Sequence, residues 1–319
     1  MMSTLEISQL VERLRAGDVR ALARAISLVE NDGPLSRDLL SACFPHTGRA
    51  IRIGITGSPG AGKSTLTDRL ARSYRSKGMT VGVIAVDPTS PFTGGAILGD
   101  RIRMQEGLHD TGLYVRSMAT RGSLGGLART TADVASVIEA SGKEIILIET
   151  VGVGQDEIDI VRLADITIVV LVPGMGDDVQ SIKAGIMEIA DIFVINKADQ
   201  EGADRVEKEV RAMQSLTTRH EGRTPPIVKT VATTGDGLDK LALAIGEMKE
   251  WLQSDGRMEA RRKQYWRDRL VQLLLSLLMR QLREHGLSES ELDHYAERIA
   301  CGEEDPYRLA DRLVAYDKN

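Results

Sequence analysis

Cysteine is nearly absent from this chain of 319 residues, which contains only Cys43 and Cys301. Two thiols cannot form a disulfide framework or a zinc site built from cysteines. We therefore expect both side chains to be reduced thiols, as is usual in a cytoplasmic protein.

Aromatic residues make up only 3% of the sequence, so the hydrophobic core must be built mainly from Val, Ile, Leu and Ala. A basic surface is missing as well, since the formal net charge is −5. This charge disfavours a nucleic-acid partner and an anionic membrane surface.

Long hydrophobic runs are also missing, because no uncharged stretch reaches the ~18 residues that a membrane span requires. Glu6, Glu12 and Asp18 lie near the start of the chain, which therefore resembles neither a signal peptide nor a transit peptide. These observations predict a cytoplasmic protein that does not span a membrane.

Between Ile51 and about Gly235, short apolar runs alternate with longer amphipathic segments. Runs that are apolar throughout are typical of strands buried on both faces of a parallel sheet. The alternation predicts an α/β fold with a mostly parallel, doubly wound sheet, in which ligands bind beyond the carboxyl ends of the strands. The expected strands are IRIGIT, TVGVIAVD, EIILIET, ITIVVLV, DIFVINK and PIVKTVA.

Helical patterns flank this central region. Residues 5–30 place apolar side chains at helical spacing, with an interruption at Gly17-Asp18. Beyond Trp251, an apolar stripe that is broader than one helix face predicts a helix over Tyr265–His285.

Residues 57–64 read GSPGAGKS and satisfy the P-loop pattern G-x-x-x-x-G-K-[ST]. Its glycines let backbone N–H groups turn inward around phosphate oxygens, Lys63 is expected to reach the β- and γ-phosphates, and the Ser64 hydroxyl to ligate Mg²⁺. An apolar strand before the pattern and an amphipathic helix after it disfavour the alternative of a plain glycine-rich turn. The predicted nucleotide-binding residues of this loop are Gly57, Ser58, Pro59, Gly60, Ala61, Gly62, Lys63, Ser64 and Thr65.

Asn196, Lys197, Ala198 and Asp199 form the motif N-K-x-D at the end of the expected strand DIFVINK. The Asp199 carboxylate can accept two parallel hydrogen bonds from guanine N1–H and the 2-amino group, whereas adenine offers neither donor. Asn and Asp are common turn formers at strand ends, but here the motif follows a P-loop in the right order. The sequence therefore predicts GTP and GDP as ligands.

Three acidic residues are candidate Mg²⁺ ligands at the same sheet edge. Glu149 closes the strand EIILIET, and the N–H of Gly152 can contact the γ-phosphate. Asp87 ends the strand TVGVIAVD, and Asp100 lies in the glycine-rich stretch that follows. The alternatives are structural, with Glu149 as a capping acid and Asp100 as a helix N-cap.

These motifs together resemble the MeaB/ArgK-type GTPases, which belong to the metallocentre-assembly class of P-loop GTPases. That class is marked by Glu in place of Asp at the position of Glu149, and the resemblance runs from about Ile53 to Asp199. The segments that carry it are GSPGAGKST, VDPTSP followed by GDRIRM, ETVGVGQDE, PGMGDDVQSIKAGIMEIAD and NKAD.

The resemblance implies a GTP-hydrolysing chaperone of an adenosylcobalamin-dependent acyl-CoA mutase. Such proteins gate cofactor transfer from a cobalamin adenosyltransferase to the mutase, and they protect or rescue the mutase from inactivation. The family's Mg²⁺-linked acids fall on Asp87, Asp100 and Glu149. The family is also dimeric, which implies a homodimer formed through a helical C-terminal arm.

The expected organisation is a helical N-terminal extension over residues 1–45, a G domain over 46–255 and a helical dimerisation arm over 256–319. The family's switch III, which couples the nucleotide state to the mutase, falls on Asp177 to about Glu188 and includes Gln180 and Lys183. The simpler alternative is that Asp177 only caps a helix.

Hydrolysis is expected to be slow in the isolated protein. Ras-like proteins orient the attacking water with a Gln directly after their D-x-x-G motif, and Val153 occupies that position here. A partner could bring in Gln155 instead. The predicted catalytic residues are Lys63, Glu149, Gly152 and Gln155.

The base-binding loop departs from the usual pattern. A Ser-Ala pair is usual at the end of the strand PIVKTVA, where this chain has Val231-Ala232. A backbone N–H, expected at Ala232, can still contact guanine O6.

Three rival functions have less support. A nickel-inserting GTPase of the same class needs a His-rich or Cys-containing store, whereas this chain has five scattered His residues and no C-x-x-C. A kinase of a transport-binding protein is an older label for the family, but the H-R-D and D-F-G motifs of protein kinases are missing. The intact motifs argue against a structural adaptor with a vestigial site.

Overall fold

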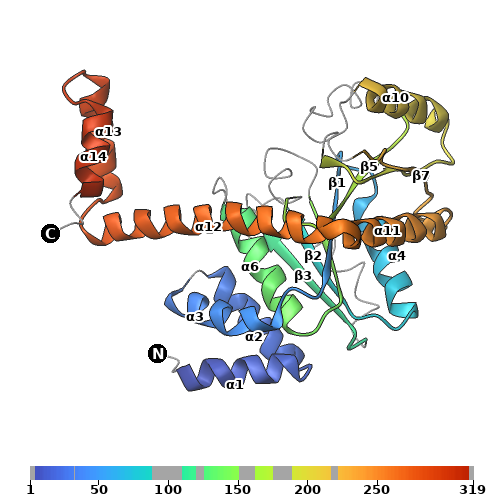
Figure 1. Cartoon of the computed structure of the whole chain (residues 1–319), viewed down its shortest axis with the longest axis horizontal. Helices are drawn as coiled ribbons and strands as arrows, with labels where there is room; N and C mark the ends of the chain where they lie inside the picture. Colours follow the sequence, from blue (N-terminus) through green and yellow to red (C-terminus); the bar gives the residue numbers. More distant parts are fainter. Residues whose placement is uncertain are drawn as a thin grey trace. The chain divides into compact units, whose positions relative to one another are not determined.

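The computed structural model describes residues 4–31, 33–87, 110–119, 126–150, 162–174, 189–216 and 222–315 (Figure 1). The chain divides into two compact units, Met1–Met258 and Glu259–Asn319. The first contains the sheet and its covering helices, and the second is helical in the described residues.

Unit 1 is built on a seven-stranded sheet with the order β3-β2-β4-β1-β5-β6-β7. Every described pairing between neighbouring strands is parallel, so the predicted parallel α/β fold is confirmed. The strands are β1 (Ile51–Gly57), β2 (Val81–Asp87), β3 (Leu113–Ala119), β4 (Ile145–Glu149), β5 (Ile166–Leu171), β6 (Ile192–Ile195) and β7 (Ile227–Lys229).

Strand β3 is the one strand of this sheet that was not expected from the sequence. Its segment LYVRSMA interrupts the apolar run with Arg116 and Ser117. In the described residues β3 pairs with β2 alone and lies at the end of the strand order, where one face need not be apolar. Arg116 forms a half-buried ion pair with Glu30 of the N-terminal extension.

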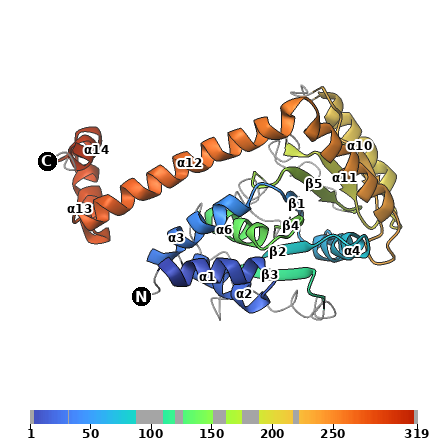
Figure 2. The same cartoon turned by 60° about the horizontal axis from the view of Figure 1, so that its bottom comes forward.

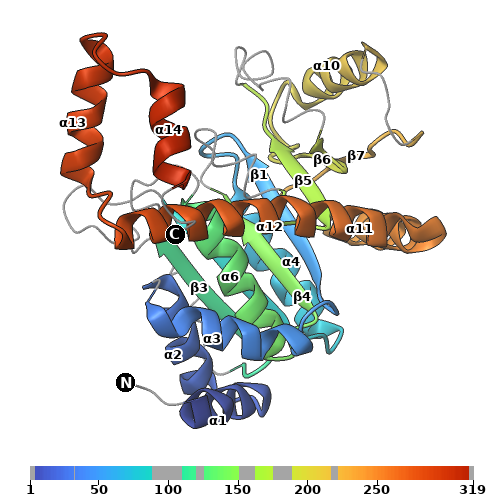
Figure 3. The ribbon, with the colours of Figure 1, turned by 60° about the vertical axis from the view of Figure 1, so that its left-hand side comes forward.

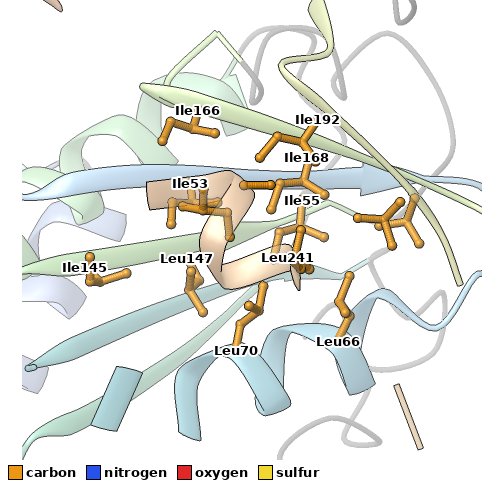
Figure 4. Close-up of a cluster of buried hydrophobic side chains, with 14 of the residues drawn as sticks. Ile53, Ile55, Leu66, Leu70, Ile145, Leu147, Ile166, Ile168, Ile192 and Leu241 are labelled. Atoms are coloured by element: carbon orange, nitrogen blue, oxygen red, sulfur yellow. The ribbon is translucent and has the colours of Figure 1, made fainter. Parts of the chain in front are cut away.

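Helices cover both faces of the sheet. Helices α4 (Lys63–Ser76) and α11 (Leu238–Gln253) pack on one face, where Leu66, Leu70 and Leu241 meet Ile53 and Leu147 (Figure 4). This buried cluster is almost entirely aliphatic, as the scarcity of aromatic residues predicts.

Helices α6 (Gly126–Ala140) and α10 (Ala203–Leu216) cover the opposite face (Figure 3). Gly82 of β2 allows α6 to come close, because a Cβ there would lie 2.4 Å from a methyl carbon of Ile138. Cover on both faces explains why the central strands are fully buried.

The N-terminal extension forms three helices, α1 (Thr4–Arg15), α2 (Val19–Glu30) and α3 (Pro34–Cys43), beside α6 (Figure 2). The predicted interruption is a helix start, since Asp18 caps α2 by accepting from the N–H groups of Arg20 and Ala21. Burial raises the pKa of the Cys43 thiol to about 11, so this side chain stays protonated near neutral pH.

Glu139 of α6 anchors the segment that leads from the extension into β1. One of its oxygens accepts from the N–H groups of Gly48, Arg49 and Ala50 at 2.6, 2.7 and 2.9 Å. The other accepts from Arg52 at 2.9 Å. Glu139 is only 4% exposed, and the paired charge and hydrogen bonds offset its loss of hydration.

The chain continues through α12 (Arg257–Glu284), α13 (Glu289–Ala300) and α14 (Pro306–Ala315). The predicted helix over Tyr265–His285 is therefore present, with its end at Glu284. A helix of sufficient length and apolarity to cross a membrane is not found among the described residues.

Candidate functional site

The described motifs converge at one edge of the sheet. Parallel strands end at the same edge, so the carboxyl ends of β1, β4, β6 and β7 lie together. Ile55 of β1 is in register with Glu149 of β4, which places the P-loop next to this acid.

Two glycines of the P-loop have no room for a side chain. Gly57 has φ +137°, and a Cβ there would lie 2.1 Å from the carbonyl oxygen of Val170. Gly62 has φ +85°, and a Cβ there would lie 2.4 Å from Nδ2 of Asn196. The backbone can therefore follow this tight path only with glycine at both positions.

Lys63 lies against the loop that precedes it. Its Nζ donates to the carbonyl oxygens of Gly57 at 2.6 Å and Ser58 at 3.0 Å, and the residue is only 6% exposed. These bonds hold a buried ammonium group at the loop whose backbone is expected to surround phosphate.

Ser64 and Glu149, two of the predicted Mg²⁺ ligands, are brought into contact. The Ser64 Oγ donates to Oε1 of Glu149 at 2.5 Å, and Glu149 is 5% exposed. Hydroxyl and carboxylate oxygens suit Mg²⁺, which commonly uses one or two protein ligands together with phosphate oxygens and water. This pair fits such a site, although no cluster of three or more His, Cys, Asp or Glu side chains occurs in the described part of the chain.

Thr150, which directly follows Glu149, fastens β4 to β1. Its Oγ1 bonds to Oγ1 of Thr56 at 3.0 Å, and its N–H donates to the carbonyl of Ile55 at 3.0 Å. Both threonines are buried. The bond between them was missed in the sequence, because it joins residues that are 94 positions apart.

Asn196 joins three segments of the site. Its Nδ2 donates to the carbonyl of Ala61 in the P-loop at 2.8 Å. Its Oδ1 accepts from Thr230 Oγ1 at 3.1 Å and from the N–H of Ala232 at 3.0 Å. Asn196 is 2% exposed, so these bonds form away from water and fix the P-loop against the loop after β7, which is the expected base-binding loop.

Lys197 adopts a left-handed backbone conformation, with φ +55°. Non-glycine residues in this region are uncommon, and they cluster at functional sites. The next N–H, that of Ala198, donates to the carbonyl of Thr230 at 3.0 Å, and Asp199 is exposed. The turn thus leaves the predicted base-reading carboxylate accessible.

The predicted role of Ala232 meets a constraint. Its N–H is donated to Asn196 in this structure, so contact with guanine O6 requires this N–H to be shared or released. Thr230, the other partner of Asn196 in this loop, was missed because it lies outside the usual motif positions.

Several predicted site residues lie outside the described part of the chain, and one further residue is described only in its backbone. Asp87 is the last residue of β2, but its side chain is not described. The predictions for these positions therefore stay predictions. The others of this group are Asp100, Gly152, Gln155, Asp177, Gln180 and Lys183.

A glycine loop between β1 and α4, a buried lysine and a parallel sheet define a P-loop nucleotide-binding protein. The sequence model described as methylmalonyl-CoA mutase-associated GTPase MeaB matches residues 22–286. The chain belongs to this family of GTPases, as its motifs predict.

Relatives align over most of the chain. A Pyrococcus abyssi protein, whose name assigns only a GTPase, is 49% identical over 97% of this chain and 96% of its own length. The GTPase ArgK of Escherichia coli K12 is 35% identical over 92% and 90% of the two chains. The Mus musculus methylmalonic aciduria type A homolog, a mitochondrial protein, is 32% identical over 95% and 79%.

A solved structure shares the fold over the full length of both chains. This protein, described as an LAO/AO transport system kinase, has 27% sequence identity and a TM-score of 0.72.

We predict that Glu149→Gln weakens the response to Mg²⁺, because a neutral amide is a poorer ligand than a carboxylate. The Mg²⁺ concentration that gives half-maximal GTP hydrolysis should rise by at least about tenfold, roughly 1.4 kcal/mol. GDP affinity measured in EDTA should change little.

Glu144→Gln is the matched control, since Glu144 is exposed and lies just before the opposite end of the same strand. An unchanged Mg²⁺ response of the Glu149 variant would remove Glu149 from the metal site.

Proposed function

We propose that this GTPase gates the delivery of adenosylcobalamin to a cobalamin-dependent acyl-CoA mutase and protects or reactivates that mutase. The printed family description supports this proposal by naming association with methylmalonyl-CoA mutase. The structural observation that best supports the GTP-binding part of this proposal is the Asn196 side chain, which links the P-loop to the base-binding loop. That link makes one site out of a phosphate motif and a base motif.

The reaction is transfer of the γ-phosphoryl group of GTP to water. The water oxygen bonds to the γ-phosphorus, the bond to the β–γ bridging oxygen breaks, and GDP and phosphate leave. The P-loop and Lys63 would hold the phosphates, while Ser64 and Glu149, with Asp87 and Asp100 as further candidates, would hold Mg²⁺. A bound Mg²⁺ would neutralise charge that develops on the phosphate oxygens.

Guanine selectivity comes from Asp199 in this proposal. Its carboxylate accepts from guanine N1–H and the 2-amino group, and the exposed position leaves it open to a ligand. Asn196 and Lys197 set the turn that presents it.

We predict that Asp199→Asn weakens GTP binding and allows xanthosine triphosphate to bind. Xanthine has an oxygen in place of the 2-amino group, and this oxygen can accept a hydrogen bond from the Asn amide. Competition against a labelled GDP analogue measures both affinities. The loss for GTP should be at least about tenfold.

Asp239→Asn serves as the control, because Asp239 is an exposed acid in the first turn of α11. The guanine assignment is wrong if ATP displaces the analogue from the wild-type protein as well as GTP does.

Coupling to the mutase is assigned to the segment from Asp177 to about Glu188. Gln180 and Lys183 are three residues apart and would share one face of a helix. A loop that differs between the GTP and GDP states can gate a partner. The adenosyltransferase that supplies the cofactor is the second expected partner.

The solved relative is described as a kinase, and this description applies to that protein only. The two activities leave different products, since a kinase yields a phosphorylated protein and a GTPase yields free phosphate. The residues of the P-loop suit either reaction, whereas the family assignment favours the GTPase.

We further propose that α12 mediates homodimerisation. Large apolar side chains along this helix are exposed in the single chain, among them Leu270, Leu274, Leu275 and Leu278 at 57%, 50%, 58% and 49%. Exposed apolar surface of this extent on one helix is typical of an interface, and most homo-oligomers close by pairing one patch with itself.

We predict that the double substitution Leu274→Glu and Leu278→Glu gives a monomer in light scattering, because each new carboxylate would lose hydration at the interface. The two positions are one turn apart on α12. Leu243→Glu on α11 is the control, since Leu243 is 67% exposed in unit 1. A double variant with the mass of a dimer would exclude this helix face as the interface.

A further inference from the structure

Arg69 connects the phosphate-binding helix to the base-binding loop. It lies on α4, which begins at Lys63 of the P-loop. Its Nε donates to the carbonyl oxygen of Ala232 at 3.2 Å, and its Nη2 donates to that of Thr233 at 2.6 Å. The two partners are 163 and 164 residues further along the chain, so this link is a purely tertiary contact.

The two bonds reach successive carbonyls of one loop. A guanidinium group is planar and charged, so its N–H donors form strong bonds in a fixed fork geometry. A fork that binds two successive carbonyl oxygens restricts the rotation of the two peptide groups that carry them. Arg69 is partly buried and its bond to Ala232 is shielded in part, whereas its bond to Thr233 lies at the surface.

Ala232 is consequently held through both of its backbone polar groups. Its N–H is bonded to Asn196 of the base motif, and its carbonyl oxygen is bonded to Arg69 of the phosphate helix. The side chain of Val231 cannot add a hydrogen bond to this arrangement.

The rest of the loop is ordered by its own backbone. Val231 and Asp236 form an isolated antiparallel bridge. Gly237, with φ +78°, brings its backbone close to Lys229, where a Cβ would lie 2.1 Å from the carbonyl oxygen. The loop is therefore a closed turn, and Arg69 attaches this turn to the helix that carries the phosphate site.

We propose that Arg69 is a positioning residue for guanine recognition. It fixes the backbone N–H groups of the base-binding loop relative to α4, the helix that carries the phosphate site. This inference rests on the proposed role of the loop at guanine O6. Without Arg69, the phosphates would still bind at the P-loop, whereas the contact with O6 would weaken.

The test compares the affinities of three nucleoside diphosphates for the full-length wild-type protein and for its Arg69→Met variant. Met keeps most of the aliphatic stem of Arg69 and removes its hydrogen-bond donors. Wild-type and variant affinities are measured for GDP, for 6-thio-GDP, whose sulfur is a weaker acceptor than O6, and for IDP, which lacks the 2-amino group. We expect GDP affinity to fall by about tenfold, as loss of a hydrogen bond to a charged group suggests. The preference for GDP over 6-thio-GDP should shrink, while the preference for GDP over IDP, which reports on Asp199, should persist.

Two further variants separate positioning from general destabilisation. Arg69→Lys keeps a charge and some donors, so it should restore part of the preference for GDP over 6-thio-GDP. Arg72→Met, one turn further along α4, removes an exposed ion pair with Asp68 and should leave all three affinities unchanged. Inorganic tripolyphosphate, measured by competition, should bind wild type and Arg69→Met alike.

Three results would overturn the inference. An Arg69→Met variant with the wild-type preference for GDP over 6-thio-GDP would remove Arg69 from base recognition, while the guanine assignment would stand. Equal losses for GDP and tripolyphosphate would show that Arg69 only supports the helix. A wild-type protein that binds ADP as tightly as GDP would overturn the guanine assignment and this inference with it.

Discussion

Pairing of β1 with β4 on one side and with β5 on the other aligns the ends of the central strands at one edge of the sheet. The P-loop leaves the end of β1, and Glu149 closes β4 next to it, so Ser64 and Glu149 can touch although they are 85 residues apart. The bond between Thr56 and Thr150 fastens the same two strands. The P-loop and the two candidate metal ligands thus depend on the register of one buried parallel sheet.

The base side of the site depends on that sheet through Asn196. This side chain follows β6 and bonds both to the P-loop and to the loop after β7. Arg69 makes a second connection between the same two regions. The phosphate-binding and base-binding segments are therefore connected by two separate sets of hydrogen bonds. Such connected networks of buried polar groups favour one arrangement over partly bonded ones.

Much of this arrangement could be predicted from the sequence, because its parts carry local signals. The apolar runs predict six of the strands, and the order of the P-loop and N-K-x-D motifs predicts a guanine nucleotide at their ends. Strand β3 could not be predicted in this way, since an edge strand tolerates polar residues such as Arg116. Thr230 and Arg69 were missed for a different reason, since each acts through a contact with a residue far away in the sequence. The tight approach of Gly62 to Asn196 likewise exists only in the folded chain.

We propose that GTP hydrolysis at this site is coupled to a cobalamin-dependent mutase. Single-turnover hydrolysis of GTP by the full-length protein, measured with and without methylmalonyl-CoA mutase, decides whether the two are coupled. The protein alone should turn over GTP far more slowly than the ~1–100 s⁻¹ of kinases. Addition of the mutase should clearly accelerate hydrolysis. A fast rate that the mutase leaves unchanged would show that hydrolysis is not coupled to the mutase.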